Sequence, residues 1–308
     1  MSDKYLKHYA EPEINSLKNI TAVYQHCICI PAFDESTVFI SRVIGFIERH
    51  PASLLIIVLN QPSDKSKSDC STNNNLTCQQ LLQNSGQSAW TNQNLQLVNY
   101  HNQSAVLIVD RFSEGLTIPA NQGVGLARKI AADLALQLIS QKVISCPWIY
   151  STDADVRLPD NYFALHRQEK SPSGKGKTES VAAFVAHYEH ISLGSNEIYQ
   201  ATQVYQARLN AYVDGLRYAD SAYAFHTLGS TLCVNEKHYA QAVFNNHCTN
   251  HNHDCTETCV EYVKKKLEAK QSLRSTKVPS CRFWFFHVVT INSKRTVSYT
   301  HLTLPTNR

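Results

Sequence analysis

The sequence predicts an α/β fold in which helices cover both faces of a mostly parallel sheet. Two apolar runs, His26 to Pro31 and Leu54 to Leu59, have the length of buried strands, and a segment of helical periodicity, Ser36 to His50, separates them. Strand, helix and strand in this order are typical of a parallel βαβ unit. The chain has 308 residues, of which 43% are hydrophobic, enough to fill the core of one large domain or two small ones.

The same alternation continues along the chain. An apolar run at Ala105 to Asp110 predicts a third strand, and a Gly-rich loop then leads into a helix whose apolar face begins at Ala127. Trp148 to Thr152 predicts a fourth strand, which leads directly into Asp153. Three later elements are expected: a strand at Val181 to Tyr188, a helix at Asn196 to Tyr218 and a strand within Thr227 to Val234.

Tyrosines recur along the expected long helix. Their spacings are close to seven residues, which places them on one helical face. This pattern favours packing against the sheet over stacking on sugars. The residues are Tyr199, Tyr205, Tyr212 and Tyr218.

The domain organisation follows from where this regularity fails. Residues 61–104 are rich in Asn, Gln and Ser, which predicts a polar surface insertion in a domain that spans residues 1–242. Ser171 to Thr178 predicts a flexible loop. Residues 243–308 lose the apolar periodicity, and the closing Val297 to Arg308 resembles a translated sequencing adapter. We therefore expect an irregular, artefactual C-terminus, and a frameshift upstream of it stays open.

Charge and composition narrow the classes of partner. The net charge of +4, from 29 Lys and Arg against 25 Asp and Glu, is too small and too scattered for a nucleic-acid surface. No apolar run approaches the roughly 20 residues of a membrane-spanning helix, and Met1 to Ala10 has no signal-peptide core. The expected location is the cytoplasm.

The ten cysteines are expected to be reduced thiols, because their spacing forms no disulfide framework. A cluster near the C-terminus leaves a structural zinc site as an alternative, although it lacks paired C-x-x-C spacing. The cluster consists of His247, Cys248, His251, His253, Cys255 and Cys259.

Asp153 and Asp155 are the strongest candidates for chemistry. Side chains alternate along an extended segment, so the two carboxylates are expected to point the same way. Carboxylates suit Mg²⁺ or Mn²⁺, which complete their coordination with water and phosphate oxygens. The pair follows a predicted buried strand, and open α/β sheets bind ligands outside the carboxyl ends of their strands. A solvated turn or a helix-capping pair is the competing interpretation.

Two further segments precede predicted helices. In Pro31 to Ser36, Asp34 or Ser36 is expected to cap the helix, which would leave Glu35 available to a ligand. In Asn121 to Arg128, glycines would let the backbone approach a phosphate at a helix N-terminus, where Arg128 could add a bidentate contact. A plain junction between loop and helix explains the same residues.

Taken in order, these motifs resemble the GT-A glycosyltransferases, especially those of family 2. The matching motifs are an I-P-A-[YF]-[ND]-E segment at Ile30 to Glu35, a Gly-rich A-R helix start at Gly123 to Arg128, and D-A-D at Asp153 to Asp155. The resemblance covers roughly residues 24–240. Thr227 to Thr231 also resembles the G-S segment that lines the acceptor side in that family.

The resemblance implies an inverting, metal-assisted enzyme of the hexosyltransferase type. It would move a sugar from a nucleotide-diphosphate donor to an unknown acceptor: a sugar, a lipid or a small molecule. The implied donor-binding residues are Pro31, Ala32, Glu35, Asn60, Arg128, Asp153, Ala154 and Asp155, with Mg²⁺ or Mn²⁺ held by Asp153 and Asp155.

This sequence departs from the family at two places. Asn60 stands in Asn60 to Ser63 where the family usually has D-D-[GA]-S; it can hydrogen-bond a base but brings no charge, and Asp110 is one possible substitute. The E-D motif that carries the catalytic base is expected after Tyr239, where Asp254 is the nearest candidate. A catalytically impaired nucleotide-sugar-binding protein, or a metal-dependent nucleotide-sugar hydrolase, is therefore the alternative.

Two other classes fit less well. A HAD-type phosphatase needs Thr or Val in D-x-D-x-[TV], where this chain has Arg157. A dinucleotide-binding regulatory module would need a glycine in place of Arg128 to complete G-x-G-x-x-G.

Overall fold

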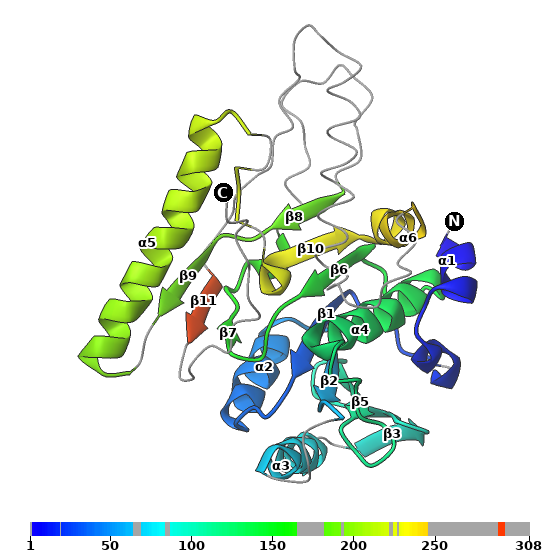
Figure 1. Cartoon of the computed structure of the whole chain (residues 1–308). Helices are drawn as coiled ribbons and strands as arrows, with labels where there is room; N and C mark the ends of the chain where they lie inside the picture. The colour runs from blue at the N-terminus through cyan, green and yellow to red at the C-terminus, as the bar shows by residue number, and fades with distance from the viewer. Residues whose placement is uncertain are drawn as a thin grey trace, which may run out of the picture.

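The computed structural model of this chain describes residues 2–18, 20–63, 69–83, 87–164, 182–191, 194–221, 224–226, 228–245 and 289–292. In chain order (Figure 1) the elements are α1 (Ser2–His8), η1 (Pro12–Ser16), β1 (His26–Ala32), α2 (Val38–Arg49), β2 (Ser53–Asn60), α3 (Asp69–Gln83), β3 (Gln87–Asn92), β4 (Leu95–Asn99), β5 (Ala105–Arg111), α4 (Gly123–Ser140), β6 (Trp148–Ser151), β7 (Val156–Arg157), β8 (Ala183–Val185), β9 (Tyr188–Ile191), α5 (Asn196–Tyr218), η3 (Gly229–Thr231), β10 (Leu232–Asn235), α6 (Glu236–Asn245) and β11 (Val289–Asn292).

Both faces of the central strands are buried, which explains their continuous apolar sequence. Every residue of β1 and β2 is buried. Alternate residues of β1 face opposite layers, with Cys27 and Cys29 packed in one cluster with α4, and Ile28 and Ile30 in the other with α2. The predicted cover of helices on both faces is confirmed.

The described residues form an eight-stranded sheet in the order β3-β4-β5-β2-β1-β6-β10-β8. The four middle strands, β5, β2, β1 and β6, pair in parallel. The flanking pairs are antiparallel on both sides, so the sheet is mixed rather than mostly parallel. The apolar runs identified the parallel core, but strand direction at the edges depends on the connections, which apolar patterns do not encode.

The polar segment 61–104 contributes to this sheet. Its described part contains α3 and the β3–β4 hairpin, which pairs with β5 and so extends one edge of the sheet. Leu81, Leu95 and Leu97 bury their side chains there. The sequence predicted a surface insertion because these apolar residues are few and are spread among amides.

The long helix α5 has the predicted bounds but not the predicted packing. It lies beside β9, at the left of Figure 1, away from α4. Tyr199, Tyr212 and Tyr218 are 51%, 66% and 96% exposed, so the expectation that the tyrosines pack against the sheet is wrong for these three. The Tyr205 ring does meet a strand residue, His190 of β9, with centroids 5.2 Å apart. Within α5, Val213 is the buried residue among those that the structure describes.

A small sheet lies beside the main one. It has the order β7-β11-β9, and its middle strand comes from the C-terminal region that the sequence analysis expected to be artefactual. The predicted loop at 171–178, the His and Cys cluster at 247–259, Asp254 and Thr227 lie outside the described residues.

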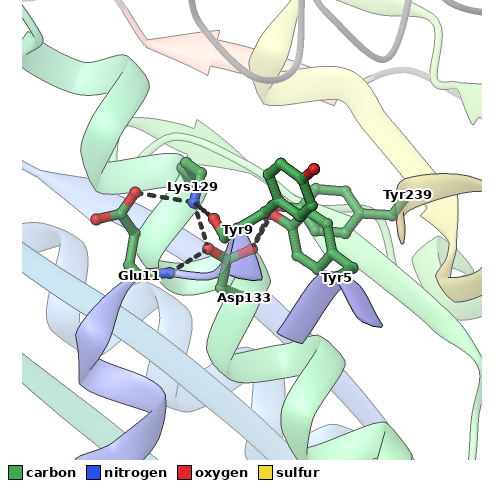
Figure 2. A network of polar contacts seen from close by, with 6 residues as sticks. All are labelled: Tyr5, Tyr9, Glu11, Lys129, Asp133 and Tyr239. Atoms are coloured by element: carbon green, nitrogen blue, oxygen red, sulfur yellow. Dashed lines mark hydrogen bonds and ion pairs between the residues drawn. The ribbon is translucent and has the colours of Figure 1, made fainter. Parts of the chain in front are cut away.

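The N-terminal segment is held against α4 by a buried polar network (Figure 2). Asp133 is fully buried and accepts hydrogen bonds from Tyr5 Oη at 2.6 Å, Tyr239 Oη at 2.9 Å and Glu11 N at 2.9 Å. Lys129 Nζ lies 2.7 Å from Asp133 and 2.8 Å from Glu11 Oε1, and it also donates to a backbone carbonyl of the segment. A buried carboxylate is stable only when it is paired in this way.

In the part of the chain that the structure describes, none of the helices combines the length and apolar character needed to cross a membrane.

Candidate functional site at the carboxyl edge of the sheet

The sheet has a topological switch point between β1 and β6. The chain proceeds from β1 to β2 and β5 on one side, and then returns to place β6 on the other side of β1. Ligands of open α/β sheets bind in the crevice outside the carboxyl ends of strands at such a point. The predicted site residues that follow β1 and β6 are therefore at the position where this architecture favours a ligand.

Pro31 lies where the two strands diverge. The β1–β6 ladder ends with the pair Cys29 and Ser151, while β1 continues to Ala32. Cys29 O accepts a hydrogen bond from Thr152 N at 3.1 Å, so its peptide groups face β6. The Pro31 nitrogen faces the same side beyond the last pair, where a missing N–H breaks no ladder bond. A proline in a central strand is thus compatible with an opening between the strands.

Asp153, Ala154 and Asp155 form a turn directly after β6. Val156 N donates to Asp153 O at 3.2 Å, so the segment is not extended, and the expectation that strand alternation aligns the two carboxylates is wrong. The Asp153 charge nevertheless acts on Asp155. A tight turn, rather than a strand, keeps the two carboxylates close.

Arginines from both helical layers meet this turn. Arg128 Nη2 of α4 donates to Asp153 Oδ1 at 2.7 Å, which joins two residues that the sequence singled out separately. Arg42 Nη2 of α2 donates to Ala154 O at 2.6 Å, and Ala154 itself is buried. Sequence reasoning missed Arg42; the available signal was a cation at the border of the apolar stripe Phe39, Val43 and Phe46.

The electrostatics of the turn favour an added cation. Burial, and after it the neighbouring Asp153 charge, raise the pKa of Asp155 to about 6, against smaller lowering effects of a backbone hydrogen bond and Arg42. Burial likewise lowers the pKa of Arg42, while Asp155 and Glu35 oppose that shift. The carboxylate pair is therefore only partly neutralised by its own arginines.

The residues present fit a divalent cation that shares its coordination with a ligand. No group of three or more His, Cys, Asp or Glu side chains within the described ranges could hold a metal by itself. Mg²⁺ is commonly held by one or two carboxylates together with waters and substrate phosphates. Asp153 and Asp155 could supply such a pair, with Arg128 already bound to one oxygen of Asp153.

The segment after β1 differs from its predicted role in helix capping. The N-cap of α2 is Thr37, and its side chain makes no capping hydrogen bond, so neither Asp34 nor Ser36 is the capping residue. Asp34 has φ 54° and accepts a hydrogen bond from Asn73 Nδ2 at 2.6 Å. Glu35 follows it and lies near the Arg42 charge.

Asn60 ends β2 and lies beside this segment. It is 3% exposed, and its Oδ1 is buried with no hydrogen-bond partner among the described residues. Asn74 of α3 joins the two strand ends, since its Nδ2 donates to Asn60 O at 3.2 Å and its Oδ1 accepts from Asp34 N at 3.3 Å. Sequence reasoning missed Asn74 because one amide in an amide-rich insertion carries no distinguishing pattern.

The Gly-rich segment forms the start of α4 as predicted. Gly123 begins the helix with φ 46°, a conformation that favours glycine. Arg128 lies further into the helix, where its guanidinium pairs with Asp153. Pro31, Ala32, Arg128 and the Asp153 turn thus lie at one edge of the sheet, with Asn60 at the neighbouring strand end.

Comparisons with known proteins add little to this geometry. No protein-family model matches the chain, and no curated protein matches it. Among solved structures, it is similar to one described as the crystal structure of a mycobacterial protein, with 12% sequence identity and a TM-score of 0.34. The alignment covers 87% of this chain and 65% of that protein, so the chain spans less than two thirds of its length. A likeness this weak supports neither a family nor a function.

Proposed function

We propose that this protein is a glycosyltransferase that moves a sugar from a nucleotide-diphosphate donor to an acceptor hydroxyl. The observation that carries the proposal is the ion pair between Arg128 and Asp153 at the switch point, next to Asp155. Cation and carboxylates at one strand edge suit a diphosphate that binds together with a divalent metal. We also propose that the α/β fold is of the GT-A type, on the resemblance of its three motifs in chain order.

Each site residue has a role under this proposal. Asn60 would hydrogen-bond the base through its buried amide, while Pro31, Ala32 and Glu35 would line the nucleoside position. Arg128 would orient the diphosphate. Mg²⁺ or Mn²⁺ bound by Asp153 and Asp155 would supply Lewis-acid stabilisation of the leaving diphosphate.

Arg42 has a positioning role in the same scheme. Its guanidinium holds the Ala154 carbonyl at 2.6 Å, between the two aspartates. It therefore fixes the turn that carries both carboxylates. Its charge also offsets part of their repulsion, since it lowers the pKa of Asp155.

Calorimetry tests the donor site directly. UDP, GDP and their sugars would be titrated with and without Mn²⁺ into the wild type and Asp155→Ala. We expect metal to strengthen nucleotide binding in the wild type and to have little effect in the variant. Asp160→Ala is the matched control, because Asp160 is exposed and pairs with Arg49 at 3.1 Å. The proposal would be refuted if the wild type binds nucleotides equally well with and without Mn²⁺. It would also be refuted if Mn²⁺ strengthens nucleotide binding in Asp155→Ala as much as in the wild type.

The alternative is a protein that binds or hydrolyses the donor without transferring its sugar. The predicted base, Asp254, lies outside the described residues, so it gives no support to completed transfer. Release of the nucleoside diphosphate without an acceptor would indicate a hydrolase. Metal-dependent binding without turnover would indicate a binding protein.

A further inference from the structure

A histidine and a buried tyrosine lie together at the edge of the sheet that carries the candidate donor site. His226 Nδ1 is 3.2 Å from Tyr188 Oη, and the two rings meet edge to face with centroids 5.2 Å apart. Tyr188 is 3% exposed, so it is a fixed partner. Tyr188 also meets His190, with centroids 5.1 Å apart, and His190 Nδ1 is held 2.5 Å from Gln206 Oε1.

The sheet places this pair at the same edge as the aspartates. β10 runs antiparallel to β6, so the segment Gly229–Thr231 before it lies beside the residues that follow β6, which include Asp153. The last residue of that segment accepts a hydrogen bond from Ala186 N at 2.8 Å. His226 precedes this segment and Tyr188 follows Ala186, so both belong to the connections at the edge of the sheet where β6 ends.

The small sheet gives a second, independent placement. β7 begins immediately after Asp155, and its Val156 is aligned through Ile291 of β11 with His190 of β9. Strands lie about 4.8 Å apart, so the backbones of Val156 and His190 are about 10 Å apart. β11 fills this interval, so the pairing places the segment that carries Tyr188 and His190 two strands away from the residue that follows Asp155.

The surroundings of His226 favour its neutral form. Burial lowers its pKa, and the charges of His187, Arg217 and His190 lower it further, against the opposing effect of Asp214. These groups come from the segment around β9 and from α5, the elements that face the ring. Within the described residues the hydrogen bond of the ring is at Nδ1; when Nδ1–H donates to Tyr188 Oη, the lone pair is on Nε2.

We propose that His226 is the proton acceptor for the attacking hydroxyl and that Tyr188 orients its ring. The inference rests on the proposed glycosyltransferase function. The acceptor oxygen forms a bond to the anomeric carbon while the bond from that carbon to the diphosphate oxygen breaks. The bonding electron pair leaves with the diphosphate, and the acceptor proton passes to Nε2, which becomes an imidazolium N–H.

Turnover of His226→Ala tests the proposal. Release of UDP or GDP would be measured from UDP-glucose, UDP-N-acetylglucosamine and GDP-mannose, with Mn²⁺ and with glucose, mannose or glycerol as acceptor. We expect kcat to fall by about 100-fold or more, the usual effect of a lost general base, with the nucleotide Kd unchanged. Tyr188→Phe keeps the ring and loses the hydroxyl, so kcat should fall by up to about tenfold.

The pH profile and chemical rescue separate catalysis from structure. Wild-type kcat should fall on the acid side as His226 gains its proton, and this limb should be absent from His226→Ala. Added imidazole should restore part of the rate of that variant only. His101→Ala is the control, because His101 is an exposed residue between β4 and β5, at the opposite edge of the sheet.

Every result decides the role of His226. The proposed role is overturned if His226→Ala retains wild-type turnover, or if turnover in this variant falls only because nucleotide binding is lost. It is also overturned if the wild type binds the donors with metal but releases no product. Absence of metal-dependent nucleotide binding in the wild type is a different failure. That result refutes the donor site itself.

Discussion

At the residue scale, the buried amide of Asn60 distinguishes a binding role from a structural one. Its Oδ1 has no partner among the described residues, so Asn60→Ala removes no hydrogen bond of that atom. We expect nucleotide affinity to fall by about 2- to 10-fold, the value of one neutral hydrogen bond, with a much smaller change in stability than a lost structural contact causes. Calorimetry and urea unfolding measure the two quantities.

Asn74→Ala is the matched control for this prediction. Asn74 bonds both strand ends, so its loss leaves two backbone groups unpaired and should lower the free energy of unfolding by about 1–3 kcal/mol. If Asn60→Ala destabilises the protein as much as Asn74→Ala and leaves nucleotide affinity unchanged, Asn60 has a structural role.

The residues of the site were predictable to different degrees. Asp153 and Arg128 were identified because each stands at the end of a strand or the start of a helix, where local pattern is informative. Their ion pair was not predicted, since it joins residues far apart in sequence. Arg42 and Asn74 reach the site from the side of a helix, and only the packing of α2 and α3 shows their direction.

At the scale of elements, apolar continuity located the core but not its borders. β1, β2, β5 and β6 are buried on both faces, so their sequence alone identified them. The β3–β4 hairpin lies at the edge of the sheet and is only partly buried, and its polar residues concealed it. For α5, the expected single tyrosine face was wrong, because two of the three spacings are six residues, which turn a helix by about 240°.

The polar network around Asp133, here called the clamp, holds the N-terminal segment on α4 and gives a prediction for a whole element. Asp133→Leu leaves the partly buried Lys129 without its closest carboxylate, so we expect the free energy of unfolding to fall by about 3–5 kcal/mol in urea titrations. Tyr5→Phe removes one hydrogen bond and should cost about 1 kcal/mol.

The double variant Lys129→Met/Asp133→Leu checks the cause. It replaces both charges with apolar groups, so it should be more stable than Asp133→Leu alone. Equal stability of the two would show that the lost hydrogen bonds of Asp133, rather than the charge of Lys129, explain the effect.

At the scale of the whole molecule, α4 takes part both in the candidate site and in the polar network that holds the N-terminal segment. Two consecutive residues of α4 make these contacts. Arg128 pairs with Asp153 at the carboxyl edge of the sheet. Lys129 pairs with Asp133 and Glu11 in the clamp. The position of α4 against the sheet therefore sets both contacts.

The pH dependence of stability follows from histidines that the fold keeps neutral. His50 packs on Phe46 and Phe163, with ring centroids 4.3 and 5.4 Å away. Burial lowers its pKa, Asp160 opposes the shift and Arg49 adds to it. Because the folded pKa lies below the unfolded one, the unfolded state takes up the proton first. The stabilisation is complete above the unfolded pKa of about 6.5 and is lost as the pH falls from there through the lower folded pKa.

Comparing variants isolates this contribution from the opposing carboxylates. Burial raises the pKa of Glu13 and Asp155, so these groups stabilise the fold at low pH and lose that effect as the pH rises. The free energy of unfolding would be measured in urea for the wild type and His50→Gln from pH 8 to pH 5. Because Glu13 and Asp155 are present in both proteins, their effect cancels when the two values are subtracted. We expect the variant to lose less stability on acidification than the wild type, while exposed His101→Gln follows the wild type. An identical loss in His50→Gln would show that burial of the His50 ring has no bearing on acid sensitivity.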